Sequence, residues 1–272
     1  MHQPIVNIAL RAAQAAGRII EQALVRGAPL TIEAKGQNDF VTLVDRAAEA
    51  AIVDVIRKNY PRHNILTEES GFLPADGGES DTTWIVDPLD GTTNFIHGLP
   101  HFAVSIGVRV RDRIEHAVVY DPMRKEEFTA SRGRGAQLND RRIRVTDRKS
   151  LEGALIGTGF PFRQEQMAHM DNYLAMFRDI ARQTAGIRRP GSAALDLAYV
   201  AAGRMDGFWE FGLKEWDMAA GCLLISEAGG LVSDFNGGET HLDSGHIVGG
   251  NPKVFKALLQ SITPHVPAGF RR

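Results

Sequence analysis

The chain has 272 residues, of which 43% are hydrophobic and 24% are charged, and its formal net charge is −2. This composition is typical of a folded globular protein and excludes a largely disordered or fibrous chain. The near balance of 31 basic and 33 acidic residues argues against a surface built wholly for nucleic acid or for an anionic membrane.

Apolar residues at helical spacing predict an N-terminal helix over residues 5–20, which ends before the Gly-Ala-Pro breaker at 27–29. A second helix is predicted over 43–59, with Thr42 as its N-cap and Pro61 beyond its end. Short β-prone runs separated by turn residues then indicate a meander, with strands at 84–86, 102–110, 114–120 and 127–130.

The second half of the chain alternates predicted strands and helices. Strands are predicted at 154–159, 207–211, 231–235 and 247–248, and helices at 164–182, 192–202, 216–228 and 252–259. We expect one domain over residues 1–272, made of two packed halves at roughly 1–150 and 151–272.

The number of cysteines and the hydropathy pattern indicate the cellular compartment in which the protein is found. Cys222 is the single cysteine, so the chain can form neither an internal disulfide nor a multi-thiolate zinc site. We expect a cytoplasmic protein, without a signal peptide and without a membrane partner, because no stretch has the required apolar pattern.

Two aspartates at the end of an apolar strand form the most informative motif, WIVDPLDGTTNF. Asp87 and Asp90 can converge on a hard cation, with the Leu89 carbonyl between them. Gly91 permits close backbone approach, so the amides of Gly91 and Thr92 could face a phosphate. The alternative interpretation is an Asx-type turn that merely ends the strand.

Two further acidic segments could complete such a site. Glu68 and Glu69 follow a short apolar stretch, and Asp217 stands at the start of a predicted helix. Taken singly, they could be solvated loop charges and a complement to the helix dipole. Together with the first motif they predict an all-oxygen site, which favours Mg²⁺ or Mn²⁺ over zinc. No serine-hydrolase elbow or nucleotide-binding Gly-Lys loop occurs.

The WIVDPLDGTTNF motif and the later WDMAAG motif resemble the two signatures of the inositol monophosphatase family. The similarity extends over nearly the whole chain, including 36–45, 65–70 and 188–199. It implies an α+β fold, a five-layered αβαβα sandwich that forms homodimers, and a Mg²⁺-dependent phosphatase inhibited by lithium. The implied substrate is a small polyol phosphate, foremost myo-inositol 1-phosphate; fructose bisphosphate, a nucleotide 3′-phosphate and histidinol phosphate are alternatives.

Residue roles follow from the same resemblance. It implies a first metal held by Glu68, Asp87 and the Leu89 carbonyl. It implies a second metal held by Asp87, Asp90 and Asp217, and a third, weaker one that uses Glu68. The implied catalytic residues are Thr92, Asp45 and Glu68. Substrate contacts are implied for Asp90, Gly91, Thr92, Gly191, Ser192, Ala193, Glu210 and Asp217.

Within this set, Thr92 would orient the attacking water with Asp45 behind it, and the amides of Gly91 and Thr92 would receive the phosphate. Gly191, Ser192, Ala193 and Glu210 would contact the polyol.

A basic window suggests a second kind of function. Residues 132–149 hold seven basic and two acidic side chains, a net charge of +5. Bacterial members of the family are implicated in ribosomal RNA transcription complexes, so the chain could be an interaction protein in transcription antitermination. RNA polymerase, a Nus factor or RNA would be the partner, with Arg188 and Arg189 left free on the surface to contribute. The alternative interpretation is a solvated loop surface.

Overall fold

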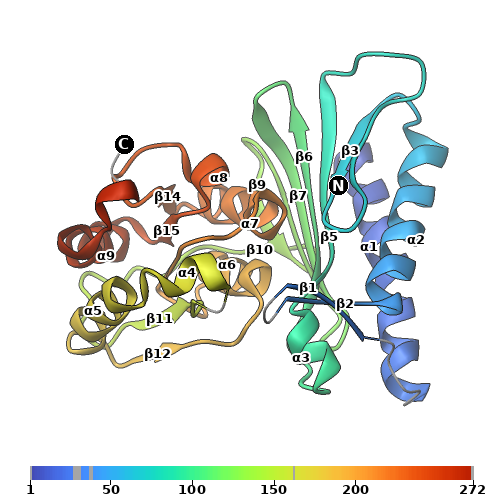
Figure 1. Ribbon diagram of the computed structural model, residues 1–272. Coiled ribbons are helices and arrows are strands. Elements are labelled where there is room, and N and C mark those ends of the chain that lie inside the picture. The colour runs from blue at the N-terminus through green and yellow to red at the C-terminus, as the bar shows by residue number, and fades with distance from the viewer. Residues whose placement is uncertain (1, 27–31, 37–38, 162, 271–272) are drawn as a thin grey trace.

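Helices and sheets alternate in five layers across the part of the chain that the structure describes (Figure 1). The computed structural model describes residues 2–26, 32–36, 39–161 and 163–270. The layers are α1 (Pro4–Arg26) with α2 (Leu43–Asn59), an eight-stranded sheet, α6 (Ala193–Ala201) with α7 (Glu215–Glu227), a five-stranded sheet, and α5 (Met170–Ala181) with α9 (Pro252–Ile262). The expected αβαβα sandwich is confirmed. None of the helices within the described ranges has the length and apolarity that crossing a membrane requires.

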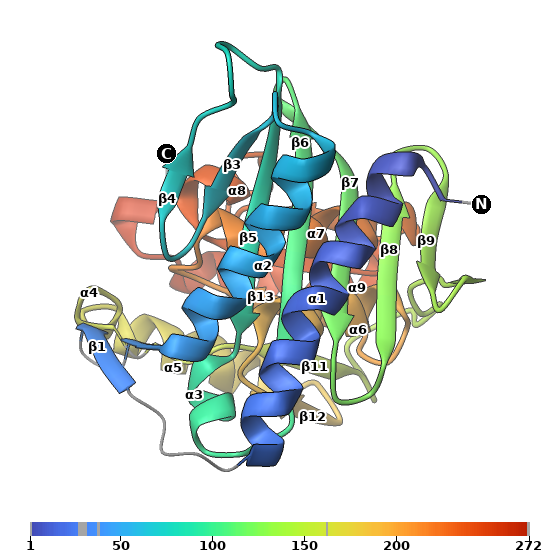
Figure 2. The same ribbon diagram turned by 90° about the vertical axis from the view of Figure 1, so that its right-hand side faces the viewer.

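The eight-stranded sheet has α1 and α2 lying across one of its faces, as Figure 2 shows. Its neighbouring strands are antiparallel except for β3 (Asn64–Thr67) and β5 (Thr82–Asp90), which run parallel. The order is β10 (Arg141–Arg142), β9 (Gly135–Leu138), β8 (Glu126–Ser131), β7 (Arg113–Asp121), β6 (Ala103–Val110), β5, β3 and β4 (Gly71–Leu73). A separate hairpin of β1 (Ile32–Gly36) and β2 (Asp39–Thr42) leads into α2.

Strand β5 is buried on both faces, which explains the uninterrupted apolar run at 84–86 in its middle. Trp84 and Val86 pack in the core beneath α1 and α2. Ile85 points to the opposite face and joins the core around α6 and α7, between the two sheets.

The five-stranded sheet has its own outer core. Ile156 and Trp209 pack there with Met176 of α5 and Leu258 of α9, whereas Phe208 faces the central core. The strand order is β12 (Gly186–Arg188), β11 (Leu155–Thr158), β13 (Gly207–Glu210), β15 (Ile247–Gly250) and β14 (Leu231–Ser233).

Helix α2 has the bounds that the sequence predicts, and its cap is confirmed. The Val44 amide donates to Thr42 Oγ1 at 3.1 Å. Asp45 completes a capping box by accepting from the Thr42 amide at 2.8 Å. Local sequence is therefore sufficient to start this helix.

The single helix predicted at 164–182 is wrong, because α4 (Gln164–Met167) and α5 are separate. His169 leaves the helical conformation at φ −110° and ψ 17°, and its ring packs against Phe270 at 4.7 Å between centroids. The breaker at 27–29 lies outside the described residues. Short elements that the sequence did not predict are β1–β4, β9, β10, β12, α3 (Thr92–Ile96), α8 (His241–Ser244) and the 3₁₀ turns η1 (Thr263–His265) and η2 (Ala268–Phe270).

Close approach of α6 and α7 makes Gly221 sensitive to substitution. A Cβ at Gly221 would lie 2.5 Å from Leu197 Cβ. We expect Gly221→Ala to destabilise the protein by about 1–3 kcal/mol, despite the better helix propensity of alanine. Urea unfolding measures this, with Gly269→Ala as the control because a Cβ there meets no atom within 4 Å. Equal stability of the two variants would contradict the prediction.

Candidate active site

A β-bulge at the end of β5 aims two aspartates at the same side of the sheet. Residues three apart in a regular strand point to opposite faces. Here Asp87 pairs with Ser105 and Asp90 with Ala103, so the stretch between the aspartates holds one extra residue. Ser105 and Ala103 are two apart and share a face, and so do their aspartate partners. Pro88 lies inside this bulge, where no ladder hydrogen bond is required of it.

Asp90 connects the first sheet to the start of α6. Its Oδ2 accepts from Ser192 Oγ at 2.6 Å and from the Ala194 amide at 2.7 Å. Amides at a helix N-terminus favour a negative charge, so this placement stabilises the carboxylate in a buried setting. Ser192 is also the N-cap of α6, since it accepts from the Leu195 amide.

Asp217 comes from the first turn of α7 and faces the same region. Its Oδ2 accepts from the Lys214 amide at 2.7 Å. The helix start is attached to β6, because Ser105 Oγ donates to the Trp216 carbonyl at 3.2 Å. The bulge of β5 and the first turn of α7 therefore bring Asp87, Asp90 and Asp217 together from distant parts of the sequence.

These carboxylates raise one another's pKa. Burial raises the pKa of Asp87 well above its usual value, and the charges of Glu68, Asp90 and Asp217 add to the effect. Burial also raises the pKa of Asp217 to about 8, again with help from its acidic neighbours. The pKa of Asp90 rises to about 6, because burial outweighs its hydrogen bonds.

The donor set fits a divalent cation. Within the described ranges, no three His, Cys, Asp or Glu side chains are placed so that they could hold a metal ion together as they stand. The acidic groups instead share one pocket and repel one another, and a cation among them would offset that repulsion. All the side chains concerned offer oxygen, which hard cations prefer.

One pocket of about 130 Å³ collects almost every predicted site residue. Asp45 is the exception, because it stands behind Thr92 and does not line the pocket. The predicted residues in the lining are Glu68, Asp87, Leu89, Asp90, Gly91, Thr92, Gly191, Ser192, Ala193, Glu210 and Asp217.

Asp45 and Thr92 form a pair at the pocket wall. Thr92 Oγ1 lies 3.0 Å from Asp45 Oδ1 and 3.1 Å from the Leu89 carbonyl. The other oxygen of Asp45 accepts from Thr42, which fixes the carboxylate at the start of α2. Burial raises the pKa of Asp45, although these hydrogen bonds oppose the shift.

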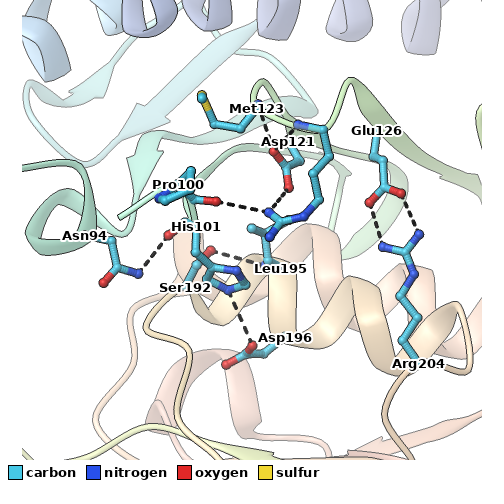
Figure 3. A network of polar contacts seen from close by, with 11 residues as sticks. Asn94, Pro100, His101, Asp121, Met123, Glu126, Ser192, Leu195, Asp196 and Arg204 are labelled. Atoms are coloured by element: carbon cyan, nitrogen blue, oxygen red, sulfur yellow. Dashed lines mark hydrogen bonds and ion pairs between the residues drawn. The ribbon is translucent and has the colours of Figure 1, made fainter. Parts of the chain in front are cut away.

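The loop before α6 is held by side chains of the first half of the chain. Asn94 Nδ2 donates to the His101 carbonyl at 2.7 Å and to the Pro190 carbonyl at 2.9 Å. Figure 3 shows Asn94, His101 and Ser192 close together on this side of α6. Gly91 adopts φ +100°, and a Cβ there would lie 3.2 Å from the Gly191 carbonyl. The loop therefore requires close backbone approach at Gly91.

Glu210 ends β13 and projects beside the end of β11. A Cβ at Gly159 would lie 1.7 Å from Glu210 Oε1, so only glycine leaves room for this carboxylate. Burial raises the pKa of Glu210 to about 8, and the charge of Asp217 adds to it. Because its pKa is raised, Glu210 keeps its proton to a higher pH than an ordinary glutamate, and the protonated form can donate a hydrogen bond.

Several lining residues were missed by the sequence reasoning. Arg163, Gln166, Arg189 and Asp196 all line the pocket. Arg188 and Arg189 are both exposed, as expected, but Arg189 also lines the pocket, so the expectation that it is free of the site is wrong. Asp196 is 2% exposed, and burial raises its pKa well above the usual value. Arg189 lies in the 188–199 stretch that resembles the family, which is the one signal that could have found it.

Comparison with known proteins identifies the family. Residues 1–267 match the model of the inositol monophosphatase family, and the chain belongs to that family of metal-dependent phosphatases. It is 63% identical to the Nus factor SuhB of Pseudomonas aeruginosa over 270 residues, which cover 99% of this chain and 100% of that protein. Identity to the Nus factor SuhB of Escherichia coli K12 is 54%, over the full length of both.

Solved structures agree with this assignment. The extragenic suppressor protein SuhB of Bartonella henselae superposes with a TM-score of 0.93 at 42% identity, covering 97% of this chain and 100% of that one. An inositol monophosphatase from Anabaena superposes with a TM-score of 0.84 at 38% identity, covering 97% of both chains.

Gly159→Ala should displace Glu210 and weaken substrate use. We expect kcat/KM for a polyol phosphate to fall by roughly ten- to a hundredfold, because misplacement by about 1 Å is enough for such losses. Steady-state phosphate release measures this. Gly269→Ala is the control, because its added Cβ meets no atom within 4 Å and, like Gly159, it does not lie at a positive φ. An unchanged kcat/KM in Gly159→Ala would contradict a substrate role for Glu210.

Proposed function

We propose that this chain is a Mg²⁺-dependent phosphomonoesterase that hydrolyses myo-inositol 1-phosphate and related small polyol phosphates. The observation that carries the proposal is one small pocket lined by Glu68, Asp87, Asp90 and Asp217. The Asp45–Thr92 pair at its wall supplies a place for the attacking water. Fructose bisphosphate, a nucleotide 3′-phosphate and histidinol phosphate stay alternative substrates.

Four carboxylates and one carbonyl would hold the cations. Glu68, Asp87 and the Leu89 carbonyl would bind a first Mg²⁺, and Asp87, Asp90 and Asp217 a second. A third, weaker ion would use Glu68, and Mn²⁺ would be a substitute. When bound, such a pair lowers the pKa of the nucleophilic water and neutralises the leaving alkoxide.

Thr92 and Asp45 would orient the water and direct its proton. The Thr92 hydroxyl donates to Asp45 Oδ1 at 3.0 Å, which leaves a lone pair of Thr92 Oγ1 to accept a hydrogen bond from water. The raised pKa of Asp45 makes it a better proton acceptor than an ordinary aspartate.

The rest of the pocket would bind the ester. The amides of Gly91 and Thr92 would receive the phosphate, which places its phosphorus for direct in-line attack. Ser192 and Glu210 line the same pocket beside Gly191 and Ala193, and they would exchange hydrogen bonds with polyol hydroxyls. A pocket that combines acidic groups with hydroxyl-binding groups supports a polyol phosphate.

We also propose that residues 1–272 form one domain, since α6 and α7 share a single core with both sheets. We propose that this domain consists of two packed halves at roughly 1–150 and 151–272. The division is supported by the order of the strands, because the first sheet ends at β10 and the second begins at β11. By analogy with the family we propose a cytoplasmic homodimer.

Asp217→Asn should abolish turnover, because it removes a charged metal ligand. The fold should stay intact, because asparagine keeps the shape of the side chain. We expect kcat to fall by more than about a hundredfold at saturating Mg²⁺. Mg²⁺ should also raise the melting temperature of the wild type more than that of the variant. Asp243→Asn, an exposed aspartate on α8, is the control. Wild-type turnover in Asp217→Asn would refute the metal assignment.

A role in transcription antitermination is a second proposal. It is favoured by the similarity to proteins named Nus factor SuhB. Arg134, Arg141, Arg142 and Lys149 of the basic window are exposed, and none of them lines the active-site pocket. Contacts with RNA polymerase, a Nus factor or RNA at this surface would therefore leave the pocket free.

Arg141→Glu with Arg142→Glu should weaken binding to RNA and leave phosphatase activity unchanged, because charge reversal acts on phosphate contacts. Binding to purified RNA, RNA polymerase and Nus factors, measured over a range of salt concentrations, tests this. Lys253→Glu with Lys256→Glu on α9 makes the same charge change at other exposed positions. Equal binding by the two double variants would exclude this surface.

A further inference from the structure

Glu49 is a buried carboxylate that holds the turn around Glu68. Its side chain projects from α2 and the residue is 4% exposed. Glu49 Oε2 accepts from Thr67 Oγ1 and, at 3.0 Å, from the Glu69 amide, while Oε1 accepts from Ser70 Oγ. The three donors flank Glu68 on both sides in the sequence.

The Glu68 turn is also attached to the sheet. On the sheet side, the Glu68 amide donates to the Val86 carbonyl at 3.2 Å, which continues the pairing of β3 with β5. Gly71 closes the turn at φ +71°, and a Cβ there would meet no atom within 4 Å. The Glu49 carboxylate connects this turn to α2, because its three donors lie on both sides of Glu68.

The position of Glu49 in α2 links it to the catalytic pair. Asp45 precedes it by one helical turn, so both side chains lie on the same buried face. Asp45 reaches Thr92 at one wall of the pocket, and Glu49 reaches the turn that carries Glu68 at another. One helix face therefore supports two walls of the site.

We propose that Glu49 is a positioning residue that orients Glu68 and thereby sets the affinity of the site for Mg²⁺. The inference rests on the proposed function, because it takes Glu68 as a metal ligand. A buried carboxylate that accepts three hydrogen bonds is held in a single orientation, and groups that orient ligands in this way govern metal affinity.

Glu49→Ala leaves three donors without their acceptor. We expect this variant to bind Mg²⁺ about 10–100-fold more weakly than the wild type does. Calorimetric titration of Mg²⁺ alone into each protein, without substrate, measures this. Glu49→Gln should recover most of the loss, because its amide can accept from Thr67 and Glu69 and donate to Ser70. At saturating Mg²⁺, KM for the substrate should stay within about twofold of the wild-type value in both variants.

Two comparisons separate positioning from mere stability. Ile52→Val removes a methylene from the same buried face of α2; it should lower the melting temperature and leave Mg²⁺ affinity unchanged. In a Glu68→Gln background, Glu49→Ala should have little further effect on Mg²⁺ affinity, because its action passes through Glu68. Independent, multiplying losses would overturn the inference, and so would wild-type affinity in Glu49→Ala.

If Glu49→Ala does not fold, Ser70→Ala takes its place. Ser70 is exposed and contributes one of the three hydrogen bonds, so we expect a loss of a few-fold in Mg²⁺ affinity; no loss would overturn the inference. The proposed function fails separately: Glu68→Gln with wild-type Mg²⁺ affinity would remove Glu68 from the metal ligands. Weak binding in Glu68→Gln with normal binding in the Glu49 and Ser70 variants would reject only the positioning role.

Discussion

Mutual repulsion among carboxylates crowded into one pocket is the constraint on which the rest of this structure depends. Asp87, Asp90, Asp217 and Glu68 share one pocket, and three of them are held away from their usual pKa by burial and by one another. Such a cluster costs stability, and a bound cation would offset that cost. The fold holds the carboxylates together from several directions, and under the proposed function Mg²⁺ would be the cation.

The central helical layer supplies much of that rigidity. An amide in the first turn of α6 donates to Asp90, and Asp217 lies in the first turn of α7. The distance between the two helices is set by small residues, as at Gly221, where Leu197 of α6 leaves no room for a Cβ. Because each sheet also packs on these helices, a change in their separation would move both aspartates.

Helix α2 gives support from outside the first sheet. Its Asp45 and Glu49 are buried acids that do not line the pocket, yet each fixes a group that does. Stability and catalysis are therefore linked in this helix. The exposed basic residues on β10 and in the following segment do not line the pocket. A phosphate-ester substrate and a binding partner would therefore not compete for the same residues.

Local sequence determined the parts of this protein that depend on near neighbours. Helix α2, its Thr42 cap and the motif at the end of β5 follow from propensity, capping and spacing, and the family resemblance identified most of the pocket. Tertiary structure alone decided the pairing that makes the β5 bulge, the break at His169 and the arrival of Glu49, Arg163, Arg189 and Asp196 at or around the site. These depend on contacts between segments far apart in the chain. A single sequence specifies what each segment prefers, but the distance between two segments is set by the packing of the layers between them.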